Sequence, residues 1–277
     1  MDQKNLRTDL HIHTTASDGT WGPEEVIEEL KSNDIGLFSI TDHDTTESIE
    51  KAAALAEENG ISFIPGVEVS VSYNKANYHI LGLGINPQNH GLQAILERNR
   101  VLMEQKDDES ILYLEARHGC VSFCEYREYI NNPERGGWKA LNYLIDKGLC
   151  SSYRDFFSLF IGYGNPFEKL DFAMPHEAVE AIRSAGGIPV LAHPGASFYS
   201  KDYKAVIKYM LTQGIGGIEC FHPENDHEIT QYCLGVCKEQ GLLITGGSDC
   251  HGDFVQGRRL GHPEIYLSSL RLDGIHF

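Results

Sequence analysis

Short apolar runs of this sequence repeatedly end at a histidine, an aspartate or a glutamate. Six of the thirteen histidines take part, together with two aspartates and one glutamate. The nine residues are His11, His13, Asp18, His43, Glu68, His79, His193, Asp249 and His251. Imidazole and carboxylate groups are common ligands of protein-bound metals. A fold that gathers the ends of these runs in one place would assemble a metal cluster, and the pattern predicts such a fold.

The spacing of apolar residues alternates between strand and helix in the first third of the chain. Runs at Leu37–Thr41 and Ser62–Val71 predict strands, and the periodic stretch Thr46–Asn59 between them predicts a helix. The alternation returns after Pro175. There we expect strands at Ile188–Ala192, Gly217–Phe221 and Leu242–Gly246, and helices at Pro175–Ser184, Tyr203–Gln213 and Asp226–Gln240. Repeating strand–helix units are typical of an α/β protein with a parallel sheet or barrel. In barrels the functional residues lie at the carboxyl ends of strands.

This alternation stops between Pro87 and Met174, where long helical segments take over. We expect helices at His90–His118, Trp138–Lys147 and Ser152–Phe160, with a loop of turn residues at 131–137. The sequence therefore predicts two parts. Residues 1–86 plus 175–277 would form the α/β domain that carries the metal site, and residues 87–174 would form a helical insertion subdomain for substrate binding.

Composition excludes several classes of protein. The chain has 277 residues, 41% of them hydrophobic, so it can bury a full core. A formal charge of -17 argues against a broad nucleic-acid surface, although divalent ions could still attract a phosphate locally. No run approaches eighteen apolar residues and the first ten residues are mostly polar, so we expect no membrane span and no signal peptide. The seven scattered cysteines predict free thiols in a reducing compartment, the cytoplasm.

The candidate ligands differ in how strongly each one indicates a metal. His11 and His13 are one residue apart on an extended segment, so both rings point the same way and can bind one ion. His43 repeats the strand-end placement. Glu68 could bridge two ions that share a hydroxide, or could be a carboxylate exposed at the sheet edge. His79 could equally be a core histidine. Mixed nitrogen and oxygen ligands leave zinc, manganese, iron and magnesium open.

Five motifs follow one another along the chain. They are His11-x-His13 running into Ser17-Asp18-Gly19, then Thr41-Asp42-His43, Gly66-Val67-Glu68, Ala192-His193-Pro194 and Ser248-Asp249-x-His251. Together they resemble the PHP (polymerase and histidinol phosphatase) family of metal-dependent phosphoesterases. The resemblance implies a distorted (β/α)7 barrel, the PHP fold, with three divalent ions, manganese being favoured. By motif position, His11, His13, Glu68 and Asp249 would hold the first ion, Asp18, His43 and His251 the second, and Glu68, His79 and His193 the third.

The resemblance also implies the reaction, which is hydrolysis of a phosphomonoester by a hydroxide that bridges the ions. The sequence contains no Gly-x-Ser-x-Gly, Walker A or catalytic-cysteine signature that would indicate a different nucleophile. We expect Glu68 and Asp249 to act in catalysis as well as in metal binding. His222, which follows a predicted strand, is a candidate to protonate the leaving group, and its alternative role is loop packing.

Residues of the helical insertion are expected to select the substrate. Arginine forks suit a second, non-reacting phosphate. The candidate phosphate-binding residues are Arg98, Asn99, Arg100 and Arg135. They resemble a segment of the nucleotide-acting branch of the family, which includes 3′,5′-nucleoside bisphosphate phosphatases and 5′-to-3′ exonucleases on short RNA. Two positions depart from that pattern: Val101 stands at the second arginine position, and Gly137 replaces the histidine expected after the loop arginine.

The leading prediction is a phosphomonoesterase that removes the 3′-phosphate of nucleoside 3′,5′-bisphosphates. Histidinol phosphate and short oligonucleotides are the alternative substrates for the same ion cluster. Two alternatives belong to other classes: a binding domain that keeps its metals for structure, and a metal-dependent C–N hydrolase. A lysine bridging two ions would indicate the C–N hydrolase, and no lysine ends a predicted strand. The oligomeric state stays open.

Overall fold

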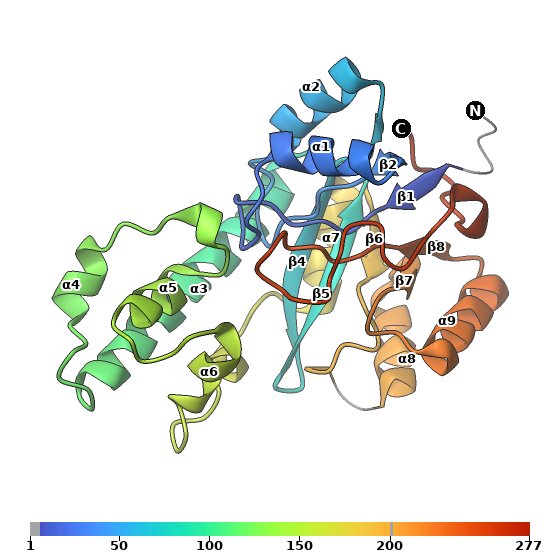
Figure 1. Cartoon of the computed structure of the whole chain (residues 1–277). Coiled ribbons are helices and arrows are strands. Elements are labelled where there is room, and N and C mark those ends of the chain that lie inside the picture. Colours follow the sequence, from blue (N-terminus) through green and yellow to red (C-terminus); the bar gives the residue numbers. More distant parts are fainter. Residues whose placement is uncertain (1–5, 200–201) are drawn as a thin grey trace.

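The strands lie in two β-sheets (Figure 1). The computed structural model describes residues 6–199 and 202–277. The smaller sheet is parallel and contains β1 (Arg7–Asp9), β2 (Ile35–Phe38) and β3 (Ser62–Phe63). The larger sheet contains, in spatial order, β4 (Gly66–Tyr73), β5 (Ala76–Leu83), β6 (Ile188–Leu191), β7 (Gly217–Phe221) and β8 (Leu243–Gly246). The α/β class is therefore as expected.

The larger sheet is mixed, whereas the sequence predicted a parallel one. β5 runs antiparallel to both β4 and β6, and only β6, β7 and β8 are parallel to one another. The cause is a two-residue turn at Asn74 and Lys75, whose φ angles of 52° and 64° fit the tight turn that joins antiparallel strands. The described residues form two sheets and no single closed barrel. Isolated backbone pairings join the sheets, between Ile12 and Cys250 and between His43 and Glu68.

Five helices cover the sheets (Figure 1). They are α1 (Pro23–Ser32), α2 (Ile49–Asn59), α7 (Pro175–Ser184), α8 (Tyr203–Gln213) and α9 (His227–Gln240). The ranges of α7 and α8 agree with the prediction. α9 begins one residue later than expected, because Asp226 is its N-cap and accepts a hydrogen bond from the Ile229 N–H at 2.9 Å. The predicted strand Ser62–Val71 is divided into β3 and β4, on either side of Ile64 and Pro65.

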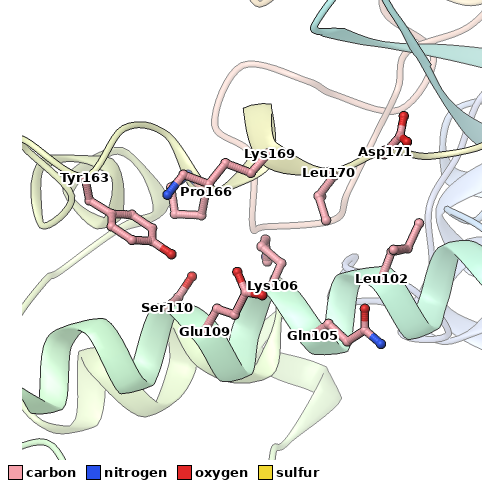
Figure 2. Close-up of a pocket in the computed structure, with 10 residues that line it drawn as sticks. All are labelled: Leu102, Gln105, Lys106, Glu109, Ser110, Tyr163, Pro166, Lys169, Leu170 and Asp171. Atoms are coloured by element: carbon pink, nitrogen blue, oxygen red, sulfur yellow. The ribbon is translucent and has the colours of Figure 1, made fainter.

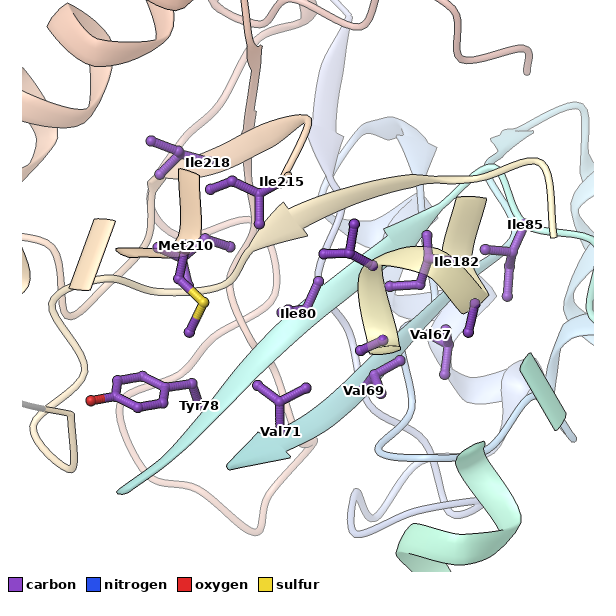
Figure 3. Close-up of a cluster of buried hydrophobic side chains, with 14 of the residues drawn as sticks. Val67, Val69, Val71, Tyr78, Ile80, Ile85, Ile182, Met210, Ile215 and Ile218 are labelled. Atoms are coloured by element: carbon purple, nitrogen blue, oxygen red, sulfur yellow. The ribbon is translucent and has the colours of Figure 1, made fainter. Parts of the chain in front are cut away.

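The main hydrophobic core lies between the larger sheet and its helices (Figure 3). Val67, Val69 and Val71 alternate along β4 and face this core, together with Ile182 of α7. Successive side chains of a strand point to opposite faces, so the residue between Val67 and Val69 faces away from the core. That residue is Glu68, and the strand therefore presents it on the face that carries the site.

Helices between the two halves of the α/β part gather to one side of the sheets (Figure 1). They are α3 (His90–Glu115), α4 (Phe123–Glu128), α5 (Lys139–Asp146) and α6 (Tyr153–Ser158), with short 3₁₀ turns η2 (Pro133–Arg135) and η3 (Pro166–Lys169); a further turn, η4 (Leu267–Ser269), follows β8. α3 joins two cores: Leu92 and Leu96 belong to the main one, and Ile111 and Leu114 to a second one. The division into two domains stays a prediction.

All seven cysteines are free thiols in this structure, as the sequence predicted. None of the helices in residues 6–199 and 202–277 combines the length and the apolar character that a membrane crossing requires.

Candidate metal centre

The nine predicted ligands come together where the two sheets meet. Their nitrogen and oxygen atoms form three overlapping groups, each within 4.8 Å: His11, His13, Glu68 and Asp249; His13, Asp18, His43 and His251; and His43, Glu68 and His79. His193 completes the set, since its Nε2 lies 2.9 Å from Glu68 Oε1. The first group has the residues expected for the first ion. The second contains His13 in addition to the expected residues, and the third contains His43 and not His193.

The ends of β1 and β8 supply one side of the cluster. His11 and His13 lie on the extended segment after β1, and their Nε2 atoms are 3.1 Å apart. Asp249 follows β8 and places Oδ1 3.1 Å from His13 Nε2 and 3.4 Å from His11 Nε2. Gly247 permits this approach, because a Cβ at its position would lie 2.4 Å from the Cβ of His11. Any residue with a side chain at position 247 would hold these two segments further apart.

Glu68 lies at the centre of the cluster and its side chain is fully buried. Its Oε2 atom is 3.2 Å from the Nε2 atoms of His11 and His13, and 3.1 Å from Nδ1 of His43. Its Oε1 atom faces the other way, 3.1 Å from His79 Nδ1. A carboxylate whose two oxygens face different sets of imidazoles has the geometry required to bridge two cations.

Hydrogen bonds fix which ring nitrogens are available to a metal. His251 Nδ1 donates to the backbone oxygen of Asp249 at 2.8 Å, which leaves Nε2 without a proton in the neutral ring. That nitrogen points toward Asp18 Oδ1 at 3.4 Å. His11 follows the same rule, because its Nδ1 lies 2.9 Å from Glu219 Oε1. An outer carboxylate or carbonyl that holds the far nitrogen is the usual support of a metal-binding histidine.

The electrostatics of the cluster fit a cation. Burial alone would lower the pKa of His13, but Asp249 and Glu68 outweigh it and raise that pKa to about 10. Burial would raise the pKa of Glu68, yet the neighbouring imidazoles, His11 first among them, hold it well below its usual range. Within the described residues, Glu68 Oε2 and Asp249 Oδ1 are buried and accept no hydrogen bond. Buried carboxylate oxygens need a positive partner, and this donor set suits a divalent metal ion.

Glu219 is a site residue that the sequence did not indicate. It lies on β7, is fully buried, and accepts hydrogen bonds from His11 Nδ1 and from the backbone N–H of His193 at 2.8 Å. One carboxylate thus orients two predicted ligands from different strands. The available signal was an acidic residue inside the apolar run Gly217–Phe221, where an unpaired charge would be costly.

His222 and Arg258 lie on the outer side of Asp249. The backbone N–H of Glu224 donates to His222 Nδ1 at 3.0 Å, so the neutral ring carries its proton on Nε2, 3.3 Å from Asp249 Oδ2. The Arg258 guanidinium pairs with Asp249 and, at 3.0 Å, with Glu224. Arg258 was not predicted, because it belongs to a loop without strand or helix periodicity.

The four predicted phosphate-binding residues all have partners within the protein. Arg98 is half exposed and lies 3.8 Å from Glu177, whereas Arg135 pairs with Asp146 at 2.9 Å. Asn99 is fully buried. Its amide group donates to Asp44 Oδ1 at 2.7 Å and to the Ser70 oxygen at 2.8 Å, and accepts from the Ala173 N–H at 3.4 Å. Arg100 donates to the Asp44 backbone oxygen at 2.8 Å. Asn99 and Arg100 therefore contact the residue next to His43.

Two pockets open beside the helical region. The larger, of about 640 Å³, lies between this region and the loop after β8, and its lining includes Arg135, Arg154 and Phe254. Figure 2 shows a smaller pocket of about 130 Å³ between α3 and the turn η3. Lys106 lines this second pocket, and its buried ammonium lies 3.8 Å from the centre of the Phe167 ring. Trp138 packs edge-on against Phe156 and Phe167.

Residues 9–145 match the sequence model of the PHP domain. Three characterised relatives align along most of the chain. A 3′,5′-nucleoside bisphosphate phosphatase from Chromobacterium violaceum is 33% identical over 92% of this chain and 91% of its own. A phosphoribosyl 1,2-cyclic phosphate 1,2-diphosphodiesterase from Eggerthella lenta is 32% identical over 91% and 97%. A 5′-3′ exoribonuclease from Haemophilus influenzae is 29% identical over 88% and 89%.

The fold is also similar to that of a solved protein from Bifidobacterium adolescentis, which is described as a candidate metal-dependent phosphoesterase. The two structures superpose with a TM-score of 0.77 over 92% of this chain and 91% of the other, at 24% sequence identity. The similarity therefore concerns the arrangement of both sheets and of the helical region as a whole.

Proposed function

Because this chain belongs to the PHP domain family and is a metal-dependent phosphoesterase, we propose that its substrate is a nucleotide with two phosphates. The reaction would remove the 3′-phosphate of a nucleoside 3′,5′-bisphosphate. The observation that carries the proposal is the convergence of nine nitrogen and oxygen ligands around Glu68. The relative from Chromobacterium violaceum supports the substrate, since it is a phosphatase of that class and aligns over 92% of the chain.

The proposed cofactor is a set of three divalent ions, with manganese favoured over zinc, iron and magnesium. When bound, such ions activate water and neutralise the charge on phosphoryl oxygens. The residues of the chain then have distinct tasks. Glu68 would bridge neighbouring ions through its two oxygens. Glu219 would hold His11 and the His193 backbone in place. The sheets, linked by the His43–Glu68 pairing, would correspond to the distorted barrel of the family.

Proton transfer to the leaving group is proposed for His222. Its Nε2 carries the proton and already faces the cluster through Asp249 Oδ2 at 3.3 Å. The Arg258 guanidinium beside it is partly exposed and pairs with the same carboxylate oxygen. We further propose that residues 87–174 form a substrate-binding subdomain, in which Arg98, Arg100 and Arg135 attract the second phosphate. A cytoplasmic location would agree with the free thiols.

A second candidate function is the stepwise removal of nucleotides from short 5′-phosphorylated RNA. The exoribonuclease from Haemophilus influenzae supports it, with 29% identity over 88% of the chain. The formal charge of -17 would limit such an activity to short chains, because a long polyanion is repelled outside the site.

Hydrolysis by the manganese-loaded protein tests these alternatives, measured as release of inorganic phosphate and, for the trinucleotide, as release of nucleoside monophosphates. The substrates are adenosine 3′,5′-bisphosphate, AMP, histidinol phosphate, phosphoribosyl 1,2-cyclic phosphate and a 5′-phosphorylated trinucleotide. We expect the highest kcat/KM for the bisphosphate. Chelation should remove the activity, and so should Glu68→Ala, whereas Glu239→Ala, at an exposed position of α9, should not. A clear preference for the trinucleotide, the cyclic phosphate or histidinol phosphate would reject the proposed substrate.

A further inference from the structure

The larger pocket differs in one respect from the pattern that the family resemblance predicts. A histidine is expected after the loop arginine, and Gly137 stands there. Both Gly136 and Gly137 have a φ of +69°, a backbone conformation that residues other than glycine rarely adopt. A Cβ at either position would lie 2.7–2.8 Å from carbon atoms of Phe254. The Phe254 ring thus fills the space that a side chain at position 137 would need.

This pocket adjoins the metal centre. Thr20 and Asp253, which line it, are each two residues from a predicted ligand, Asp18 and His251 respectively. The Asp253 N–H donates to Thr20 Oγ1 at 2.8 Å, and the Gly137 N–H donates to the Asp18 backbone oxygen at 2.8 Å. The second bond joins the glycine loop (Gly136 and Gly137) to the loop that carries Asp18, and the first joins that loop to the one that carries His251. The pocket therefore lies beside the loops that carry Asp18 and His251.

Aromatic and cationic groups share the lining of the pocket. The rings of Phe254 and Tyr153 lie with their centres 5.7 Å apart at 49°, and neither ring is fully buried. Arg135 and Arg154 lie beside them, and Arg154 Nε donates to the Tyr153 hydroxyl at 3.3 Å. Aromatic faces beside arginines are suited to a nucleobase that carries a phosphate nearby. The volume of about 640 Å³ is within the range of small-molecule sites.

We infer that Phe254 and Tyr153 form a base-binding site, in which the nucleobase of the substrate stacks on Phe254 while its 3′-phosphate reaches the metal centre. This inference rests on the proposed function. It assigns base recognition to a residue of the loop after β8, not to the helical region alone. In the pattern of the family resemblance, a histidine stands at position 137. Here the Phe254 ring occupies the space beside Gly137, so Phe254 is the residue that would contact the base.

The test compares two substrates of the manganese-loaded enzyme: adenosine 3′,5′-bisphosphate and the matching abasic 3′,5′-bisphosphate. Phe254→Ala should reduce the ratio of their kcat/KM values by about 10- to 100-fold, the range expected for the loss of one stacked base. Most of the change should appear in KM. Phe254→Tyr, which keeps an aromatic face, should retain the ratio of the wild type. The matched control is Phe157→Ala, a partly exposed phenylalanine of α6 that does not line the pocket.

Thermal unfolding checks that each variant is folded, and Tyr153→Leu provides a second probe of the same pocket if Phe254→Ala is unstable. An unchanged ratio in the folded Phe254→Ala or Tyr153→Leu variant would overturn the inference. So would an equal loss in Phe157→Ala. A wild-type enzyme that hydrolyses both substrates equally well would reject the base-binding site and leave the phosphatase function standing. A wild-type enzyme that hydrolyses neither would reject both.

Discussion

Glu219→Gln should weaken metal binding although Glu219 is not itself a predicted ligand. The wild-type carboxylate accepts from His11 Nδ1 at 2.9 Å and from the His193 backbone N–H at 2.8 Å. Glutamine has one oxygen for these two donors. The backbone N–H can only donate, so the glutamine oxygen must face His193 and its NH₂ group must face His11 Nδ1. The ring of His11 then has to move its proton to Nε2, the atom that points at Glu68.

The size of this effect follows from the hydrogen bond that is lost. A hydrogen bond to a charged group contributes about 1.5–3 kcal/mol, and loss of an outer partner of a metal ligand weakens affinity by about 10- to 100-fold. The two estimates agree, since each factor of ten is about 1.4 kcal/mol. We therefore expect the Kd for manganese, measured by calorimetric titration of the metal-free protein, to rise about 10- to 100-fold.

Glu239→Gln is the matched control for this prediction, because it makes the same chemical change at an exposed position of α9. Its Kd should equal that of the wild type. A Glu219→Gln protein that binds manganese as tightly as the wild type would show that His11 does not depend on Glu219 for its tautomer. In that case the assignment of Glu219 to the support of the metal centre would be wrong.

Four further predictions concern the helical region. Asn99→Ala should lower kcat more than it changes KM, because it leaves Asp44 Oδ1 without its 2.7 Å donor beside His43; steady-state kinetics checks this. Arg135→Ala should instead raise KM for the bisphosphate more than it lowers kcat. Asp107→Asn should destabilise the protein by about 3–5 kcal/mol in urea unfolding, because Lys106 loses its buried partner at 2.7 Å. In Lys106→Met, burial keeps the pKa of Asp107 raised, so the free energy of unfolding should fall as pH rises from 4 to 7. A free energy of unfolding that stays constant over this pH range would contradict the prediction.

The sequence was most informative where chemistry and periodicity coincide. Seven of the nine predicted ligands follow strands or turn residues, whereas Glu68 and His79 lie within β4 and β5. Strand ends that share one side of an α/β fold come together, so the seven were predictable as a group. The ranges of α7 and α8 were predicted because Pro175 starts one helix and Gly214 ends the other. Local signals of this kind depend on neighbouring residues alone.

The features that the sequence did not indicate depend on distant parts of the chain. The role of Glu219 requires β7 to lie beside both the end of β1 and the end of β6. The antiparallel direction of β5 follows from a turn of Asn74 and Lys75, which lacks the glycine that usually indicates a hairpin. Asn99 was predicted to contact a phosphate from its motif alone, whereas its full burial and its hydrogen bonds to Asp44, Ser70 and Ala173 depend on distant parts of the chain.

Asp9, at the end of β1, has a consequence for how the site is assembled. Its carboxylate accepts from the backbone N–H groups of Ser248 at 2.9 Å and Gly261 at 2.8 Å, contacts that span 239 and 252 positions of the chain. Loops of this length close late in folding, because their entropy must be lost before any contact stabilises them. The metal centre therefore exists only in the native chain, and ions that bind there shift the folding equilibrium toward the folded protein by mass action.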